Sequence, residues 1–385
     1  RISSPFTLFE SSHRYRDNGL WTTATASGGA STFDAAAGLV SLSVTTASDS
    51  SVIRETSKCF PYQPGKSLLV MSTFTLNPAK ANLRQRIGYY GASNGMYLEL
   101  DNSTLALVER SSSTGSLVET RVPSSEWNTD RLDGTGPSNL TLDPTKAQIL
   151  WMDIEWLGLG TVRMGFVING KLIHCHSFHH ANIITSTYIT TASLPLRYEI
   201  TNTAATASSS TLKQVCSTVL SEGGYELRGL QQAIGTTITS PYALITAGTY
   251  YPLISLRLKS TALDAIVILT AISLLAATAN VNYTWRVVAT PTTTGGTWTS
   301  AGSNSGVEYN LTGTATTGGR ILAQGYLSST NQSTGSVDIL KEALFKFQLE
   351  RDGLTETPYE LSLVAAASVS TSNIHASMDW EEISR

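Results

Sequence analysis

The sequence predicts an all-β protein made of two antiparallel β-sandwich, jelly-roll-like domains. Short stretches in which apolar and polar residues alternate are separated by turns rich in Gly, Asn and Ser, as expected for β-strands. Charged residues make up 14% of the chain, too few for a helical bundle or coiled coil. The 385 residues exceed the ~100–200 typical of one domain, which favours two. A hydrophobic share of 41% argues against disorder.

The clearest strands belong to the first half of the chain. An antiparallel meander is expected over residues 147–157, 161–168 and 171–178. Its last two strands are joined by Asn169-Gly170, a pair that accepts positive φ and favours a two-residue hairpin turn. Earlier strands are expected over 66–74 and 96–110.

A run of small polar residues, TNTAATASSS at 201–210, indicates a loop or linker. We therefore predict domains at 1–215 and 216–385, with a short helical turn near 212–220. Residues 341–349 fit either a helix or a strand. The strands expected in the second half cover 250–259, 265–277, 282–289, 319–327, 359–367 and 374–380.

One apolar segment, residues 265–279, raises the question of a membrane span. No charge occurs between Asp264 and Arg286. A membrane helix needs ~20 predominantly apolar residues, and here Ser, Thr and Asn interrupt the run. Because residues 281–285 alternate like a strand, we expect a buried core strand and no membrane span. No signal peptide is visible at the start of the sequence.

Charge and cysteine content narrow the possible partners and cross-links. The formal charge of −3 argues against nucleic acid as a partner, because phosphate binding favours a basic surface. Three cysteines do not make a disulfide framework. Buried reduced thiols are the favoured interpretation, with a Cys59–Cys216 bridge as the alternative.

The strand around Asp153 and Glu155 is the best catalytic candidate. On a strand these carboxylates and Trp151 share one face, and paired carboxylates are what glycoside hydrolysis requires. The string WMDIE at 151–155 resembles the Glu-x-Asp-x-Glu strand of family 16 glycoside hydrolases, which have a concanavalin-like jelly roll. Because Trp151 occupies the place of the nucleophilic Glu, we expect no enzyme activity, no catalytic residues and no cofactor. A glycan hydrolase remains the least favoured alternative.

A histidine-rich strand offers a candidate metal site. Strand alternation places His174 and His176 on one side and Cys175 on the other. Imidazoles are good zinc ligands, and a third ligand would come from His179 or His180. The alternative is a set of polar strand residues with Cys175 in the core.

Aromatic residues offer a candidate carbohydrate-binding site. Tyr89, Tyr90 and Tyr97, together with Trp151, have the flat rings that stack on sugars. The favoured interpretation of these rings is packing in the core or against another subunit.

Several longer strings resemble structural proteins of tailed bacteriophages, of the tail, baseplate or fibre type. The resemblance covers most of the chain and both predicted domains. Its strings are KCFPYQPGK (58–66), RIGYYGASNG (86–95), DGTGPSNLTL (133–142), AQILWMDIEWLGLGTVRMGFVINGKLIHCHSFHHAN (147–182), LPLRYEITNT (194–203), YPLISLRLKS (251–260), residues 264–275 and 283–288, GGRILAQGYLSS (318–329) and ASMDWEEI (376–383).

This resemblance implies a non-enzymatic component of the virion, with no catalytic residues to carry over. Its partners would be other copies of the chain, first of all in a trimer, and other virion structural proteins. Neutral strand surfaces with few charges suit broad interfaces between such copies. The alternative function is a module that binds a carbohydrate or host receptor, with a host surface glycan as its ligand.

Overall fold

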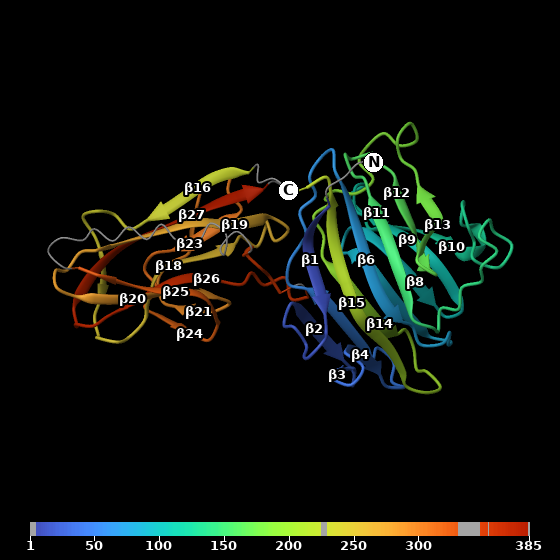
Figure 1. The fold of residues 1–385 in the computed structure, drawn as a ribbon, viewed down its shortest axis with the longest axis horizontal. Helices are drawn as coiled ribbons and strands as arrows, with labels where there is room; N and C mark the ends of the chain where they lie inside the picture. Colours follow the sequence, from blue (N-terminus) through green and yellow to red (C-terminus); the bar gives the residue numbers. More distant parts are fainter. Residues whose placement is uncertain (1–4, 225–228, 330–346, 353, 384–385) are drawn as a thin grey trace. The chain divides into compact units, whose positions relative to one another are not determined.

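The structure is a computed structural model that describes residues 5–224, 229–329, 347–352 and 354–383. The chain forms two compact units, Arg1–Glu226 and Leu227–Arg385. Both are built from antiparallel sheets, which confirms the predicted all-β, sandwich-like fold (Figure 1). The division falls after the predicted boundary at 215/216, because that position lies inside a long strand, β15 (Ser210–Glu222).

The first unit contains an eight-stranded sheet and a seven-stranded sheet in its described residues. A 3-10 turn, η1 (Ser124–Glu126), follows β10. The larger sheet consists of β1 (Phe6–Ser12), β3 (Ala30–Asp34), β4 (Leu39–Val44), β6 (Ser67–Thr75), β11 (Gln148–Ile154), β12 (Val162–Ile168), β13 (Lys171–Phe178) and β15. The smaller consists of β2 (Trp21–Ala26), β5 (Ser51–Thr56), β7 (Leu83–Tyr90), β8 (Gly95–Asp101), β9 (Thr104–Ser111), β10 (Val118–Pro123) and β14 (Leu196–Asn202).

One core joins the two sheets of this unit. Leu42, Phe74 and Phe166 from the larger sheet pack in the same buried cluster as Ile87 and Leu196 from the smaller. Each such side chain contributes about 1.5–3 kcal/mol by leaving water. The alternate residues of each strand therefore point away from the core, and on the smaller sheet these carry the candidate site.

The strand β15 closes the larger sheet. One of its edges pairs with β6, and the other pairs first with β4 and then with β1. The first strand of the unit thus lies against the last, with Phe6 opposite Ser221. The predicted helical turn near 212–220 is wrong: these residues alternate between buried and more exposed positions, as a strand between two partners requires.

The predicted meander over 147–178 is confirmed as β11, β12 and β13. Asn169 and Gly170 form the hairpin turn between β12 and β13, with φ of 52° and 74°. These positive values explain why this residue pair was a reliable signal for the turn.

The described residues of the second unit form a four-stranded sheet, a six-stranded sheet and a two-stranded ribbon. The four-stranded sheet contains β16 (Leu230–Gly235), β17 (Tyr242–Leu244), β19 (Ile266–Ala276) and β27 (Ser372–Ile383). The six-stranded sheet contains β18 (Tyr251–Leu258), β20 (Asn282–Ala289), β22 (Thr299–Ser300), β23 (Val307–Asn310), β25 (Arg320–Ser328) and β26 (Leu361–Ala367). The ribbon is β21 (Thr292–Thr294) with β24 (Ala315–Thr317).

The apolar segment 265–279 forms β19, as predicted, and pairs with β27. Val267 and Leu269 enter the second core. No helix within the described residues combines the length and apolar character needed for a membrane crossing. Most of the predicted element at 341–349 lies outside the described residues.

None of the three cysteines forms a disulfide, which confirms the thiol interpretation over a Cys59–Cys216 bridge. Cys59 and Cys175 are buried, whereas Cys216 is half-buried. Burial raises the pKa of the Cys175 thiol to about 12, which keeps it protonated and unreactive.

Candidate functional site

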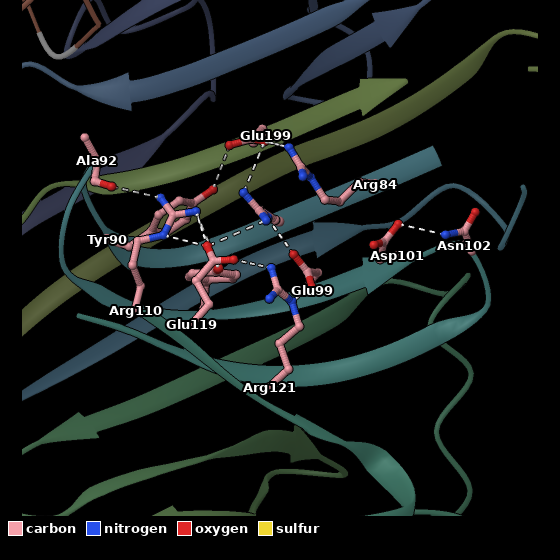
Figure 2. Close-up of polar contacts among 12 residues, drawn as sticks. Arg84, Tyr90, Ala92, Glu99, Asp101, Asn102, Arg110, Glu119, Arg121 and Glu199 are labelled. Atoms are coloured by element: carbon pink, nitrogen blue, oxygen red, sulfur yellow. Dashed lines mark hydrogen bonds and ion pairs between the residues drawn. The ribbon is translucent and has the colours of Figure 1, made fainter. Parts of the chain in front are cut away.

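The outward side of the seven-stranded sheet carries a layer of arginine, glutamate and tyrosine side chains (Figure 2). The sheet positions them by alternation, because the residues between them belong to the core. We call this layer the Arg–Glu–Tyr face. It comprises Arg84, Arg86, Arg110, Arg121, Arg197, Glu55, Glu99, Glu119, Glu199, Tyr90 and Tyr97.

Glu99 is almost completely buried, with 1% of its surface exposed, and two arginines bond to its carboxylate from two sides. Its Oε2 accepts a hydrogen bond from Arg86 Nε at 2.6 Å, and its Oε1 accepts one from Arg121 Nε at 2.8 Å. Hydrogen bonds between charged groups are the stronger kind, and here they compensate for the lost hydration of Glu99.

The other glutamates of the face are paired in the same manner. Glu119 Oε1 accepts hydrogen bonds from Arg110 Nε at 2.9 Å and Nη2 at 2.6 Å. The carboxylate of Glu55 accepts one from Arg197 Nε at 2.6 Å. The carboxylate of Glu199 lies 3.2 Å from Arg84 Nη2 and 3.7 Å from Arg86 Nη1. Each of the four glutamates on the face therefore has an arginine partner.

Tyr90 and Tyr97 lie between these charges, with ring centroids 4.5 Å apart. The Arg110 guanidinium lies over both rings, at 5.3 and 5.1 Å from their centroids. Arg86 lies over Tyr97 at 5.2 Å and Arg197 over Tyr90 at 5.3 Å. Such cation–π contacts hold the guanidinium groups flat against the sheet, so that the layer has a fixed shape.

The electrostatics of the face favour the ionised form of Glu119. Burial opposes ionisation of Glu119, but hydrogen bonds from Tyr97 and Arg110 outweigh it and lower its pKa to about 2. The five arginines oppose four glutamates and Asp101, which lies across from Arg84, so the formal charges cancel. The face therefore presents no net charge that would attract a polyanion.

Such an arrangement is poorly suited to acid catalysis on a glycan. A general acid must hold its proton near neutral pH, which requires a raised carboxyl pKa. The arginine partners act in the opposite direction at Glu119. What the face does offer is a rigid, charge-balanced polar surface.

The depressed pKa of Glu119 makes a pH dependence testable. Its ionised form stabilises the fold above pH 4.5, and this contribution is lost as the pH falls from about 4.5 to about 2. We expect the wild-type chain to lose stability across this interval and Glu119→Gln to lose less. Urea unfolding at several pH values measures the difference, and parallel curves for the two chains would contradict the assignment.

The four rings considered as a candidate sugar-binding site do not gather at one place. Tyr90 and Tyr97 lie on the Arg–Glu–Tyr face, but both are fully buried under arginines. Tyr89 points into the core, where its hydroxyl donates to the carbonyl of Ala192 at 2.7 Å. Trp151 belongs to β11 of the other sheet and is 6% exposed. Their placement matches packing in the core more closely than an open groove.

The two histidines predicted to bind metal are separated by a β-bulge. His174 lies opposite Gly165, whereas His176 lies opposite its neighbour Met164, so that Cys175 is left out of the pairing. Burial lowers the pKa of His176 to about 4, and its Nδ1 accepts a hydrogen bond from the backbone N–H of Asn128 at 3.2 Å.

His180, one of the two histidines considered as a third metal ligand beside His179, is engaged elsewhere. Both ring nitrogens of His180 have partners, Glu109 Oε2 at 2.7 Å and the Gly160 carbonyl at 2.5 Å. Its ring stacks on Tyr188 at 3.9 Å. Within the described ranges, no three His, Cys, Asp or Glu side chains are grouped so that they could hold a metal ion.

Asp153 and Glu155, the carboxylates considered for glycan hydrolysis, both pair with Arg163. Asp153 lies directly opposite Arg163 in the sheet, and Arg163 Nη2 is 3.0 Å from Glu155 Oε1. The two carboxylates therefore share one arginine as an ion-pair partner.

Sequence reasoning missed the Arg–Glu–Tyr face. A signal was available in charged residues two apart, although none of these pairs lies in a strand predicted from the sequence: Arg84 with Arg86, Glu119 with Arg121, and Arg197 with Glu199. Residues at this spacing share a face of a strand. Charges repeated on one face of several strands indicate a polar layer rather than isolated surface residues.

Comparisons with known proteins show what this chain is similar to. No protein-family model matches the chain, and no curated protein matches it. Among solved structures, a carbohydrate esterase from Shiga toxin-encoding bacteriophage phi24B has a TM-score of 0.35 and 13% identity, covering 57% of this chain and 100% of that one. The CBM2 module of the evolved Dit of Lactobacillus casei BL23 phage J-1 has a TM-score of 0.35 and 6% identity, covering 59% and 100%.

A third similar structure comes from a bacterium. A glycosyl hydrolase family protein from Mycobacterium fortuitum has a TM-score of 0.37 and 8% identity, covering 56% of this chain and 99% of that one. The structures similar to this chain thus include phage proteins and proteins named for carbohydrate binding or hydrolysis.

Proposed function

We propose that this chain is a non-enzymatic structural protein of a phage virion, in the tail, baseplate or fibre. It acts through contacts with its own copies and with other virion proteins. The observation that carries the non-enzymatic part is the pairing of every glutamate on the Arg–Glu–Tyr face with arginine. The virion part rests on the sequence strings that resemble tailed-phage structural proteins in both units.

An open sheet edge supports the contact with other copies. The edge strand β13 of the larger sheet has backbone partners from outside the sheet, because the N–H groups of Thr129 and Asp130 donate to the Cys175 carbonyl. The edge strand β10 of the smaller sheet pairs only with β9 among the described strands. Leu117 and Val118, at the start of β10, are 56% and 46% exposed. Unpaired edges with apolar side chains favour pairing with another chain.

The oligomeric state tests this contact. We expect light scattering of the purified chain at micromolar concentration to give the mass of a trimer. A charge on an exposed strand edge opposes pairing, so Val118→Lys should shift the population toward monomer. Thr120→Lys adds the same charge to the same strand without removing an apolar side chain. An equal shift in both variants would assign the effect to charge, and a larger shift in Val118→Lys would assign it to the apolar contact at Val118. A wild-type chain that stays monomeric would contradict the assembly proposed here.

The place of the protein in a particle tests the virion role itself. We expect the chain among the proteins of purified virions by mass spectrometry, and antibody labelling at one structural feature by electron microscopy. Its absence from purified particles would overturn the proposal. Release of reducing sugar from host polysaccharide by the purified chain would overturn its non-enzymatic part.

The second function considered, binding of a carbohydrate or host receptor, has no open groove at the four rings predicted from the sequence. A different surface, in the second unit, has the chemistry for a glycan and is described next.

A further inference from the structure

The outward side of the six-stranded sheet carries aromatic and polar side chains beside the strand β25. Tyr283 and Trp285 of β20 point into the core, so Thr284 and Arg286 point away from it. Directly across the strand pair, Tyr326 lies opposite Thr284 and Gln324 lies opposite Arg286. Opposed residues of an antiparallel pair share a face. We call the set of Tyr250, Thr284, Arg286, Gln324 and Tyr326 the tyrosine–arginine patch.

Arg286 is held in place by an aromatic ring and not by an acid. Its guanidinium lies over the Tyr250 ring at 4.0 Å from the centroid. The Tyr250 hydroxyl lies 3.3 Å from Thr284 Oγ1, which ties the ring to the same strand. The contact fixes the direction of the guanidinium, so little freedom is lost when it binds a ligand.

Within the part of the chain that the structure describes, Arg286 has no hydrogen-bond acceptor. Its Nε is buried without a hydrogen-bond partner. Among the residues that the structure describes, no acceptor or carboxylate bonds to any nitrogen of this side chain. A ligand that brings an acceptor to the guanidinium would add a charge-assisted hydrogen bond.

A second arginine of the same sheet shows the contrast. Arg257 lies over Trp298 at 4.1 Å from the ring centroid, almost the same distance as Arg286 from Tyr250. Its Nε, however, donates to Glu308 at 3.0 Å. One stacked arginine thus has an acid from its own chain, and the other has none among the described residues.

The β25 side of the patch is open to solvent, whereas Tyr250 and Thr284 are half-buried. Tyr326 is 80% exposed. Gln324 is exposed beside it, and Ile321 on the same strand is 47% exposed. Tyrosine and isoleucine offer apolar surface, whereas the glutamine amide offers both a donor and an acceptor.

We propose that the tyrosine–arginine patch binds a glycan that carries a carboxylate, such as a uronic or sialic acid. Arg286 donates to the carboxylate, the Tyr326 ring lies against the sugar, and Gln324 bonds to hydroxyl groups. Arginine matches a carboxylate in geometry and charge. This inference goes beyond the virion role, since a scaffold protein needs no such site, and it stands on different residues from those of the Arg–Glu–Tyr face.

Binding of trigalacturonic acid tests the proposal, with its neutral methyl ester as the matched ligand. Titration calorimetry of the full chain in a buffer with EDTA measures both, and N-acetylneuraminic acid distinguishes a sialic from a uronic source. We expect the acid to bind at least about tenfold more tightly than the ester, the effect of one charge-assisted hydrogen bond. Added salt should weaken binding of the acid more than binding of the ester.

Three variants locate the binding. Arg286→Gln should lower the affinity for the acid about tenfold and leave the affinity for the ester unchanged. Tyr326→Ala should weaken both ligands about threefold, and its exposure makes misfolding no concern. Arg257→Gln, the matched control with an acid of its own, should change neither.

Several results would overturn the proposal. One is equal affinity for the acid and the ester, and another is no binding of either trigalacturonic or N-acetylneuraminic acid at millimolar concentration. The third is a loss of affinity for the acid in Arg257→Gln equal to that in Arg286→Gln. Should Arg286→Gln fail to fold, the comparison of acid with ester and the Tyr326→Ala variant decide. None of these outcomes bears on whether the chain is found in virions, so the two proposals fail separately.

Discussion

Replacing Glu99 by Gln is expected to destabilise the first unit by about 3 kcal/mol, because it removes the nearest anion of a buried arginine and leaves only the more distant Glu119 and Glu199. Glu99 binds Arg86 at 2.6 Å and Arg121 at 2.8 Å, and Arg86 is only 5% exposed. The isosteric amide keeps the shape but removes the charge that lies nearest to Arg86. Native-state hydrogen exchange of the β7 and β8 amides measures the free energy of unfolding of this sheet.

The matched control for this variant is Asp101→Asn at the margin of the same face. Asp101 is half-buried and accepts a hydrogen bond from the exposed Asn102 side chain at 3.1 Å. An exposed contact of this kind contributes less than about 0.5 kcal/mol. If Glu99→Gln and Asp101→Asn shift the free energy of unfolding equally, the layer does not depend on buried ion pairs.

Replacing Gly88 by Ala is expected to cost about 3 kcal/mol, at the upper end for overpacking. A Cβ on Gly88 would lie 2.3 Å from the Met96 carbonyl oxygen and 2.5 Å from the Tyr97 Cα. Both are backbone atoms of β8, which cannot move without disturbing the pairing of β7 and β8. The same hydrogen-exchange measurement on the β8 amides reports the effect.

Gly91→Ala, three residues further along, is the control for this substitution. A Cβ there meets only side-chain atoms of Pro195 and Leu194, at 3.9 and 4.0 Å, which are ordinary contacts. We expect little change or a slight gain, since alanine restricts the unfolded chain. A Gly88→Ala chain as stable as Gly91→Ala would show that β7 and β8 separate more easily than their packing indicates.

Much of the fold follows from local sequence. The strand β20, Asn282–Ala289, has the bounds that alternation predicts, and Asn169-Gly170 marks its hairpin because both residues adopt positive φ. Such features depend on a few adjacent residues. The unit boundary depends on pairing instead: β15 continues past the predicted division because its second half pairs with β1, far earlier in the chain.

The candidate site was harder to predict, because its partners are distant in sequence. Arg197 and Glu55 are separated by 142 positions, and only the pairing of β14 with β5 brings them together. Strand alternation shows that Arg197 and Glu199 share a face, but not which charges oppose them. The burial of Tyr90 has the same origin, since the arginines that cover it come from β9 and β14.

The β-bulge at Cys175 is another feature that could not be predicted from the sequence. Simple alternation places His174 and His176 on one face, and one residue left out of the pairing moves them to different neighbours. A bulge depends on how two strands fit locally and has no reliable signature in a single sequence.

The pairing of β1 with β15 has a mechanical consequence. Phe6 and Ser221 are opposite each other in antiparallel strands, so a pull that separates these two residues loads the hydrogen bonds of the pair one after another. A ladder opened in this way peels at low force, whereas one loaded along its length resists as a whole. In single-molecule stretching between Phe6 and Ser221, β1 should detach first, while the remaining strands of the larger sheet stay paired.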